Sequence, residues 1–179
     1  MSQHPDIDTQ APLTNFSQCH AGIVRHLDSF DELPALLVPA QRARKIAADF
    51  LGFFREAAFD HHQDEERELF PAVLRSSEPG PERAHVQQMV DALTHEHREI
   101  EALWNRLAPQ LKRLAHGQPA DVDGAACSLL VQRYRTHARV EEQEFLPLAE
   151  RILQRDGNHM AALGLSLHMR HQAPPLAHV

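Results

Sequence analysis

The chain has 179 residues, 42% of them hydrophobic and 24% charged, a balance typical of one globular domain with a modest core. Its formal net charge of −7 and the lack of a Lys/Arg cluster argue against nucleic acid or an anionic membrane as a partner. The sequence starts without the basic and apolar regions of a signal peptide, and no apolar run approaches the ~18 residues of a membrane span. We therefore expect a cytoplasmic protein.

Apolar residues recur at helical spacing along most of the chain, and only seven glycines occur, so we expect an all-α fold. Four long helices are predicted, at about 14–32, 40–74, 81–116 and 124–155. Thr14 is a suitable N-cap for the first, and the prolines of the stretch 33–39 are expected to end it. The domain is thus expected at 14–155, between a flexible N-terminus (1–13) and a C-terminal tail (156–179) that holds one short helix.

Each of the last three predicted helices has one stripe of inward-facing residues. The second helix has Ala47, Phe50, Phe54, Ala58, His61, Glu65, Leu69 and Ala72. The third has Val90, Leu93, His97, Ile100, Trp104, Leu107, Leu111 and Leu114. The fourth has Ala126, Leu130, Tyr134, His137, Glu141, Phe145, Leu148 and Ile152. Histidine and glutamate thus interrupt two stripes that are otherwise typical of a core.

Two stretches of the sequence repeat the same spacing. "HHQDEERELFP" at 61–71 and "HARVEEQEFLP" at 137–147 both read His-x-x-x-Glu-Glu-x-Glu-x-x-Pro. The helix before each stretch also carries an aligned histidine, His20 or His97, with isoleucine three residues later. The chain therefore contains two similar helical hairpins, and we expect them to pack as an up-down-up-down antiparallel four-helix bundle.

The inward histidines and glutamates predict a metal site. Histidine and glutamate four residues apart lie one turn apart on the same face of a helix. Buried without a partner, such groups would cost several kcal/mol, and two bound cations remove that cost. The six candidate ligands are His20, His61, Glu65, His97, His137 and Glu141. Divided symmetrically, each metal takes two histidines and shares both glutamates, which leaves a solvent bridge and an open position. Nitrogen and carboxylate donors favour iron or manganese.

The register of the second helix has an alternative, because His62 and Glu66 are also four residues apart. The stripe favours His61 and Glu65, since residue 62 points about 100° away from it. The remaining motif glutamates are expected to be outward or boundary charges: Glu66, Glu68, Glu142 and Glu144.

Other residues near the predicted site are open alternatives. Glu101, one turn beyond His97, is a candidate seventh ligand, and Tyr134 is a candidate hydrogen-bond donor to a bound ligand. The Glu-x-x-His spacing of ferritin-like sites occurs once, at residues 82–85, off the stripe. Pro71 and Pro147 are expected to loosen their helices and to mark helix ends away from the site.

The stretches "CHAGI", "HHQDEERELFP", "HEHREI" and "HARVEEQEFLP" resemble the hemerythrin-like family, the HHE cation-binding domains, over about residues 14–155. The resemblance implies a non-haem di-iron centre on the six residues named above, and chemistry with O2 or NO. It departs from the oxygen carriers, which have a fifth histidine on the third helix where this chain has Leu93 or Glu101. The four-His, two-Glu set is more similar to proteins linked to repair of iron centres under stress, whose cysteine-bearing N-terminal domain has no counterpart here.

Our first hypothesis is a domain that binds or senses O2 or NO at an open position of the metal pair. The alternatives are a di-iron oxidase, peroxidase or NO-reducing enzyme, and an iron donor for damaged iron centres. A symmetric pair, open at both metals, also predicts a poor reversible oxygen carrier. Finally, Cys19 lies beside His20 and Cys127 lies about 15 Å along the bundle from the metal layer, so no disulfide between them is expected.

Overall fold

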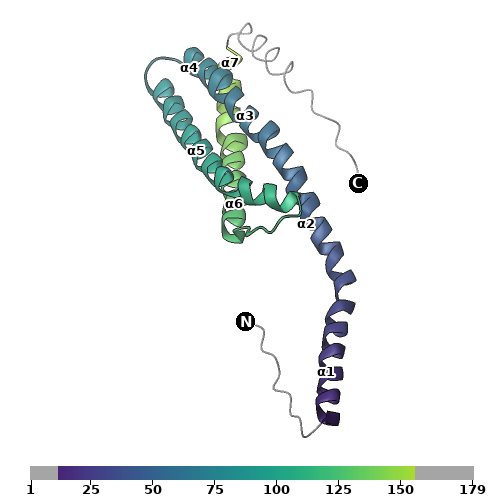
Figure 1. Ribbon diagram of the computed structural model, residues 1–179. Coiled ribbons are helices and arrows are strands. Elements are labelled where there is room, and N and C mark those ends of the chain that lie inside the picture. Colours follow the sequence, from purple (N-terminus) through teal and green to yellow (C-terminus); the bar gives the residue numbers. More distant parts are fainter. Residues whose placement is uncertain (1–11, 156–179) are drawn as a thin grey trace. The chain divides into compact units, whose positions relative to one another are not determined.

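The computed structural model describes residues 12–155, without the side chains of 12–19, 56 and 57 (Figure 1). The expectations for residues 1–11 and for the tail 156–179 lie outside this range. All regular elements of the described residues are helices, and no strand occurs among them, so the all-α prediction is confirmed. None of these helices is long and apolar enough to cross a membrane. The chain divides into two compact units, residues 1–46 and 47–179, and each is described by itself.

The N-terminal unit holds α1 (Pro12–Asp31) and most of α2 (Leu33–Phe53). The expected break at 33–39 is wrong, because only Glu32 separates the two helices. Pro34 lies in the first turn of α2, where a missing N–H removes no helical hydrogen bond, and Pro39 lies inside the helix. Thr14 is inside α1 and is not its N-cap.

Three helical rods make up the described part of the C-terminal unit, 47–155. The first comprises the end of α2, the π-helix η1 (Phe54–Phe59), α3 (Asp60–Asp64), the π-helix η2 (Glu65–Leu69) and α4 (Phe70–Ser76). The second is α5 (Pro81–Ala115). The third comprises α6 (Gly124–Val140), the π-helix η3 (Glu141–Phe145) and α7 (Leu146–Leu153). α4 packs against α5 and α7, and α5 packs against α6. The antiparallel four-helix bundle stays a prediction, because it also requires α1.

The two connections between the rods lie in the gaps between the predicted helices. In the first, Gly80 has φ 105°, a left-handed conformation that favours glycine, and Pro81 begins α5. In the second, Asp123 caps α6 by accepting a hydrogen bond from the backbone N–H of Ala126 at 2.9 Å. These local signals place both ends of α5 and the start of α6 within one residue of the predicted positions.

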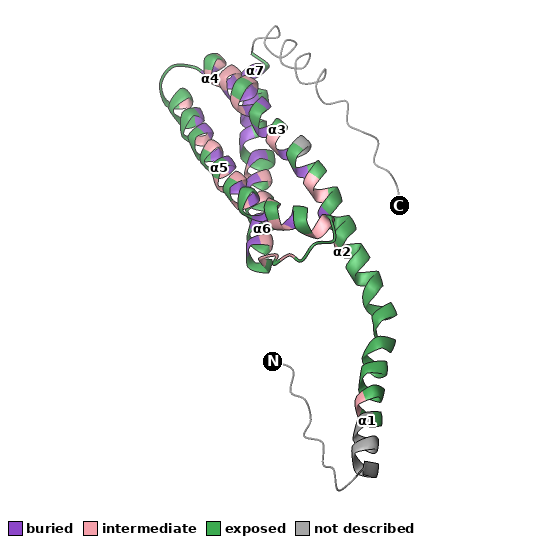
Figure 2. Ribbon diagram, viewed as in Figure 1, coloured by how far each residue is buried: buried purple, intermediate pink, exposed green. Residues whose placement is uncertain are grey.

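The buried residues follow the inward faces of the three rods (Figure 2). The stripe predicted for α5 is confirmed. Its seven members from Val90 to Leu111 are buried, and its last member, Leu114, packs against the core. The core consists of two apolar clusters, one toward the α4–α7 end and one that includes Trp104 and Leu130. Along each rod, buried histidine or glutamate lies between the residues of these two clusters. The polar layer is therefore enclosed above and below by apolar packing.

The π-helices η2 and η3 occur at the same place in the two sequence repeats. In each, the backbone N–H before the proline bonds five residues back, from Phe70 to Glu65 and from Leu146 to Glu141. A proline ring clashes with the carbonyl four residues earlier, and a wider turn relieves that clash. The prediction that Pro71 and Pro147 loosen their helices is confirmed. The prolines themselves lie six residues beyond Glu65 and Glu141, but the wide turns that precede them begin at these two candidate ligands.

Candidate metal centre

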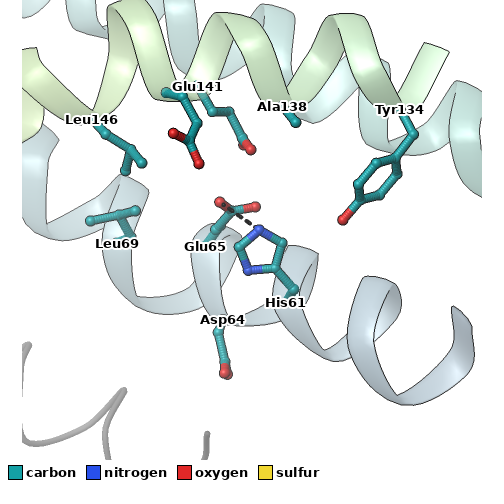
Figure 3. Close-up of a pocket in the computed structure, with 9 residues that line it drawn as sticks. His61, Asp64, Glu65, Leu69, Tyr134, Ala138, Glu141 and Leu146 are labelled. Atoms are coloured by element: carbon teal, nitrogen blue, oxygen red, sulfur yellow. Dashed lines mark ion pairs between the residues drawn. The ribbon is translucent and has the colours of Figure 1, made fainter. Parts of the chain in front are cut away.

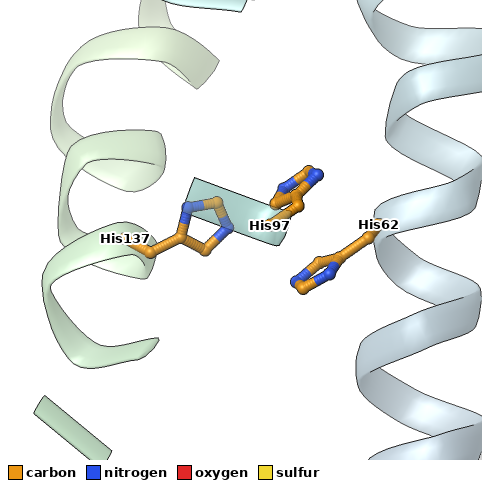
Figure 4. Close-up of side chains that lie close together, drawn as sticks. All are labelled: His62, His97 and His137. Carbon is orange, nitrogen blue, oxygen red and sulfur yellow. The ribbon is translucent and has the colours of Figure 1, made fainter. Parts of the chain in front are cut away.

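Five buried side chains bring their ligand atoms together at the centre of the C-terminal unit. One group is His62, His97 and His137, and the other is Glu65, His97, His137 and Glu141. Within each group, one ligand atom per residue lies within 4.8 Å of all the others. The three imidazoles converge from three different rods (Figure 4).

Six buried polar atoms of this cluster have no hydrogen-bond partner. They are both ring nitrogens of His62, Glu65 Oε2, His97 Nε2, His137 Nε2 and Glu141 Oε1. Some lie at ion-pair distances, such as 3.4 Å from His97 Nε2 to Glu65 Oε2, but without hydrogen-bond geometry. Leaving a buried polar atom unpaired costs about 1–3 kcal/mol. A cation bound by these nitrogens and oxygens removes that cost, so the donor set fits a metal.

Two histidines are oriented from outside by glutamates. His97 Nδ1 donates to Glu66 Oε1 at 2.8 Å, and His137 Nδ1 donates to Glu96 Oε2 at 3.0 Å. A carboxylate on Nδ1 fixes the tautomer in which Nε2 keeps its lone pair for a metal. Glu66 was expected to be an outward or boundary charge, and it lies at the boundary, with 22% of its side chain exposed. Its hydrogen bond to His97 was not predicted, and its counterpart in the repeat, Glu142, is exposed.

His61 and His62 exchange the places that the sequence predicted for them. The side chain of His62 is 1% exposed and belongs to the cluster, whereas that of His61 is 42% exposed. The expectation that His62 points away from the interior is wrong. The reason lies one turn earlier, in η1, where a π-helical turn inserts an extra residue and advances the inward register from 61 to 62.

A cavity of about 410 Å³ opens on the other side of the two carboxylates (Figure 3). His61, Glu65 and Glu141 line it, and His61 Nε2 lies 3.3 Å from Glu65 Oε1. Tyr134 also lines it and contacts the ring of His137, with 6.1 Å between the ring centroids. The carboxylates thus have three histidines on the enclosed side and one on the cavity side, in place of the expected symmetric division.

The stacked rings of His62 and His97 have opposite electrostatic environments. Burial acts to lower the pKa of His97, but contacts with glutamates 141, 65 and 66 outweigh it and raise the pKa to about 9. Burial, together with the neighbouring His97 and His137, lowers the pKa of His62 to about 3. Against the effect of burial, contact with His97 lowers the pKa of Glu141. The carboxylates therefore favour one positive charge at the centre, which a bound cation supplies as well as a proton does.

The remaining candidates have different outcomes. His20 lies on α1 in the N-terminal unit and is exposed there, so its role as a ligand stays a prediction. Glu101 Oε1 lies 3.6 Å from His62 Nδ1, on the outer side of that ring. Trp104 stacks on Phe54 with 4.4 Å between ring centroids and is a core residue. Cys127 is a free cysteine.

Comparison with known proteins agrees with this site. The family model of the hemerythrin HHE cation-binding domain matches residues 11–149, and the chain belongs to this family, whose domains bind cations. An uncharacterized protein of Haemophilus influenzae is 28% identical over 158 residues, which cover 84% of this chain and 88% of that protein. No solved structure matches the chain.

Proposed function

We propose that this protein is a non-haem di-iron protein that binds or senses O2 or NO. The observation that carries the proposal is the convergence of three buried histidines and two buried glutamates whose inward atoms lack hydrogen bonds. Mixed nitrogen and carboxylate donors suit iron or manganese better than magnesium or calcium. Membership of the hemerythrin HHE family supports the same chemistry.

The proposed ligands form two unequal positions. The enclosed position has His62, His97 and His137, with Glu65 and Glu141 available to bridge. The cavity position has His61 and the other faces of the same carboxylates. His20 stays a ligand predicted from the sequence. This set adds His62 to the six residues predicted from the sequence.

The cavity is the proposed place of a small ligand. Apolar side chains of Leu69 and Leu146 line it beside the carboxylates, and a small diatomic molecule fits easily within about 410 Å³. Tyr134 also lines this cavity and is the proposed hydrogen-bond donor to such a ligand. Burial, followed by Glu141 and Glu65, raises the pKa of its hydroxyl, which therefore keeps its proton at neutral pH.

The proposal is tested by loading the protein with Fe²⁺ without oxygen and measuring iron per chain. Two tightly bound ions per chain are expected, and one or none would contradict a di-iron site. Stopped-flow absorbance after mixing with O2, and separately with NO, then tests the activity. Stable adducts support binding or sensing, steady turnover supports an oxidase, peroxidase or NO-reducing enzyme, and loss of iron to an acceptor protein supports iron donation.

The antiparallel four-helix bundle and a cytoplasmic location also remain proposals. The two similar hairpins of the sequence support the bundle, and the matched family domain extends over residues of both units.

A further inference from the structure

Arg98 joins two of the glutamates around the cluster. It follows His97 on α5, and its guanidinium pairs with Glu66 of η2 and with Glu101, one turn further along α5. Nη1 lies 3.2 Å from both carboxylate oxygens of Glu101. A guanidinium is planar and has five N–H donors, so it holds two carboxylates at once in fixed directions.

Each of these carboxylates faces a different histidine of the cluster. Glu66 accepts the hydrogen bond from His97 Nδ1, and Glu101 Oε1 lies 3.6 Å from His62 Nδ1. The two imidazole rings are stacked, with centroids 3.9 Å apart and planes at 4°. Arg98 is thus connected to His97 through the hydrogen bond of Glu66, and to His62 through a contact of Glu101 at 3.6 Å that is not a hydrogen bond.

We propose that Arg98 is a positioning residue that orients His62 and His97 for metal through Glu66 and Glu101. The inference rests on the proposed metal-binding function. Without the guanidinium, the two carboxylates would repel each other and turn toward water, and both imidazoles would lose their outer support. Groups that support metal-binding histidines in this way are worth about 10- to 100-fold in metal affinity.

The proposal predicts the opposite sign from simple electrostatics. Removal of a positive charge near a cation site should strengthen cation binding if only the net charge matters. If Arg98 acts by holding the carboxylates, its removal should weaken binding. The direction of the change therefore separates positioning from charge.

The experiment titrates the full-length protein with Co²⁺ and records both affinity and the visible absorption of the bound ion. Arg98→Ala is compared with Arg133→Ala, which removes a similarly exposed arginine (50% against 54%) paired at 3.0 Å with Glu99, outside the cluster. Arg98→Ala is expected to weaken binding about 10- to 100-fold and to change the Co²⁺ spectrum. Arg133→Ala should leave the spectrum unchanged and the affinity equal or slightly higher.

A double-mutant cycle tests the route through Glu66. Glu66→Gln keeps the size of the side chain and removes its charge, so Arg98→Ala should cost clearly less in the Glu66→Gln background than in the wild type. Additive losses would overturn this route. Arg98→Lys keeps the charge without the planar fork and should restore binding only in part, whereas complete rescue would show that an ion pair holds the carboxylates without the fork geometry.

The outcomes separate the two proposals. Wild-type protein that binds no Co²⁺ would contradict the metal site itself. Wild-type protein that binds Co²⁺ while Arg98→Ala behaves like Arg133→Ala, or binds more tightly, would overturn only the role of Arg98. Circular dichroism checks that each variant is folded. If Arg98→Ala is not, Arg98→Lys and Glu66→Gln carry the test, and wild-type affinity and spectrum in both would overturn the proposal.

Discussion

At the scale of single residues, the nature of the chemistry was predictable and the choice between neighbouring residues was not. His97, His137, Glu65 and Glu141 are buried together as the repeat predicted. His62 replaces His61 in the enclosed cluster because η1 holds one extra residue in its turn, and residues 54–59 contain no proline that would have signalled it. Helical periodicity assumes a constant pitch, so a wide turn changes which of the residues that follow it faces inward, although Glu65 and Leu69 are buried as predicted.

Substitution of the two adjacent histidines tests this register. His62→Ala should weaken Co²⁺ binding at least about 10-fold, because it removes a donor from the enclosed position. His61→Ala should instead lower the Fe²⁺ bound per chain from two ions to one. His95→Ala is the control, because that histidine is 77% exposed on α5 and pairs only with Glu99 at 3.9 Å. Unchanged binding in His62→Ala would restore the register predicted from the sequence.

The raised pKa of His97 predicts that metal binding depends on pH. A pKa of about 9, above the ordinary 6.5, means that His97 is protonated in the metal-free protein at neutral pH and that this charge stabilises the metal-free fold fully below 6.5. That contribution is lost as the pH rises through 9. A metal must displace the proton, so affinity should rise by up to about tenfold per pH unit between 6.5 and 8.5. Isothermal titration with Co²⁺ at three pH values measures the slope, and a flat profile would contradict the assignment.

At the scale of elements, the ends of α5 and the start of α6 were predictable because glycine, proline and aspartate act locally there. The wide turns η2 and η3 were predictable only in part. The repeated prolines indicated a loosened helix, but the sequence did not show on which side of the proline the extra residue would lie. The glutamates of the site therefore occupy the turns that the prolines distort.

Replacement of Pro147 by alanine should separate helix stability from metal binding. Alanine supplies the missing N–H and removes the clash, so an ordinary α-helical turn becomes accessible and Tm should rise. The same change rotates Glu141 relative to α7, so Co²⁺ affinity should fall about 10-fold. Pro109→Ala is the matched control, because Pro109 lies inside α5 and outside the π-helices, and it should raise Tm without changing affinity. Equal affinity in both variants would show that η3 does not position Glu141.

At the scale of the whole molecule, the buried polar layer links metal binding to folding. The unpaired atoms of the cluster oppose folding in the metal-free protein, and a bound cation satisfies them only in the folded state. Free metal at 100 times Kd should stabilise the protein by about 2.7 kcal/mol. Thermal unfolding measured with Co²⁺, and again after chelation, tests this stabilisation. The magnesium ion is the control: it should change Tm little, because it prefers oxygen ligands. Equal Tm with and without Co²⁺ would contradict the coupling.

The unequal division of histidines also changes the expectation for oxygen binding. The sequence predicted a symmetric pair and therefore a poor reversible carrier. The structure places three histidines on the enclosed side of the carboxylates and one on the cavity side, so the two proposed irons differ in their open positions. The symmetry argument against reversible binding therefore no longer applies, and cycles of O2 exposure and removal decide the question directly.

His20 is the candidate that tests how both units contribute to one function. The sequence repeat pairs His20 with His97, and the family match extends from residue 11. Because the enclosed donors all belong to residues 62–141, His20→Ala should leave one tightly bound iron and abolish or strongly weaken the second. The measurement is iron per chain after gel filtration of anaerobically loaded protein, with His26→Ala on the same helix as control. Loss of both ions would show that His20 supports the whole centre. Retention of both would exclude it as a ligand and leave His61 as the only histidine of the cavity position.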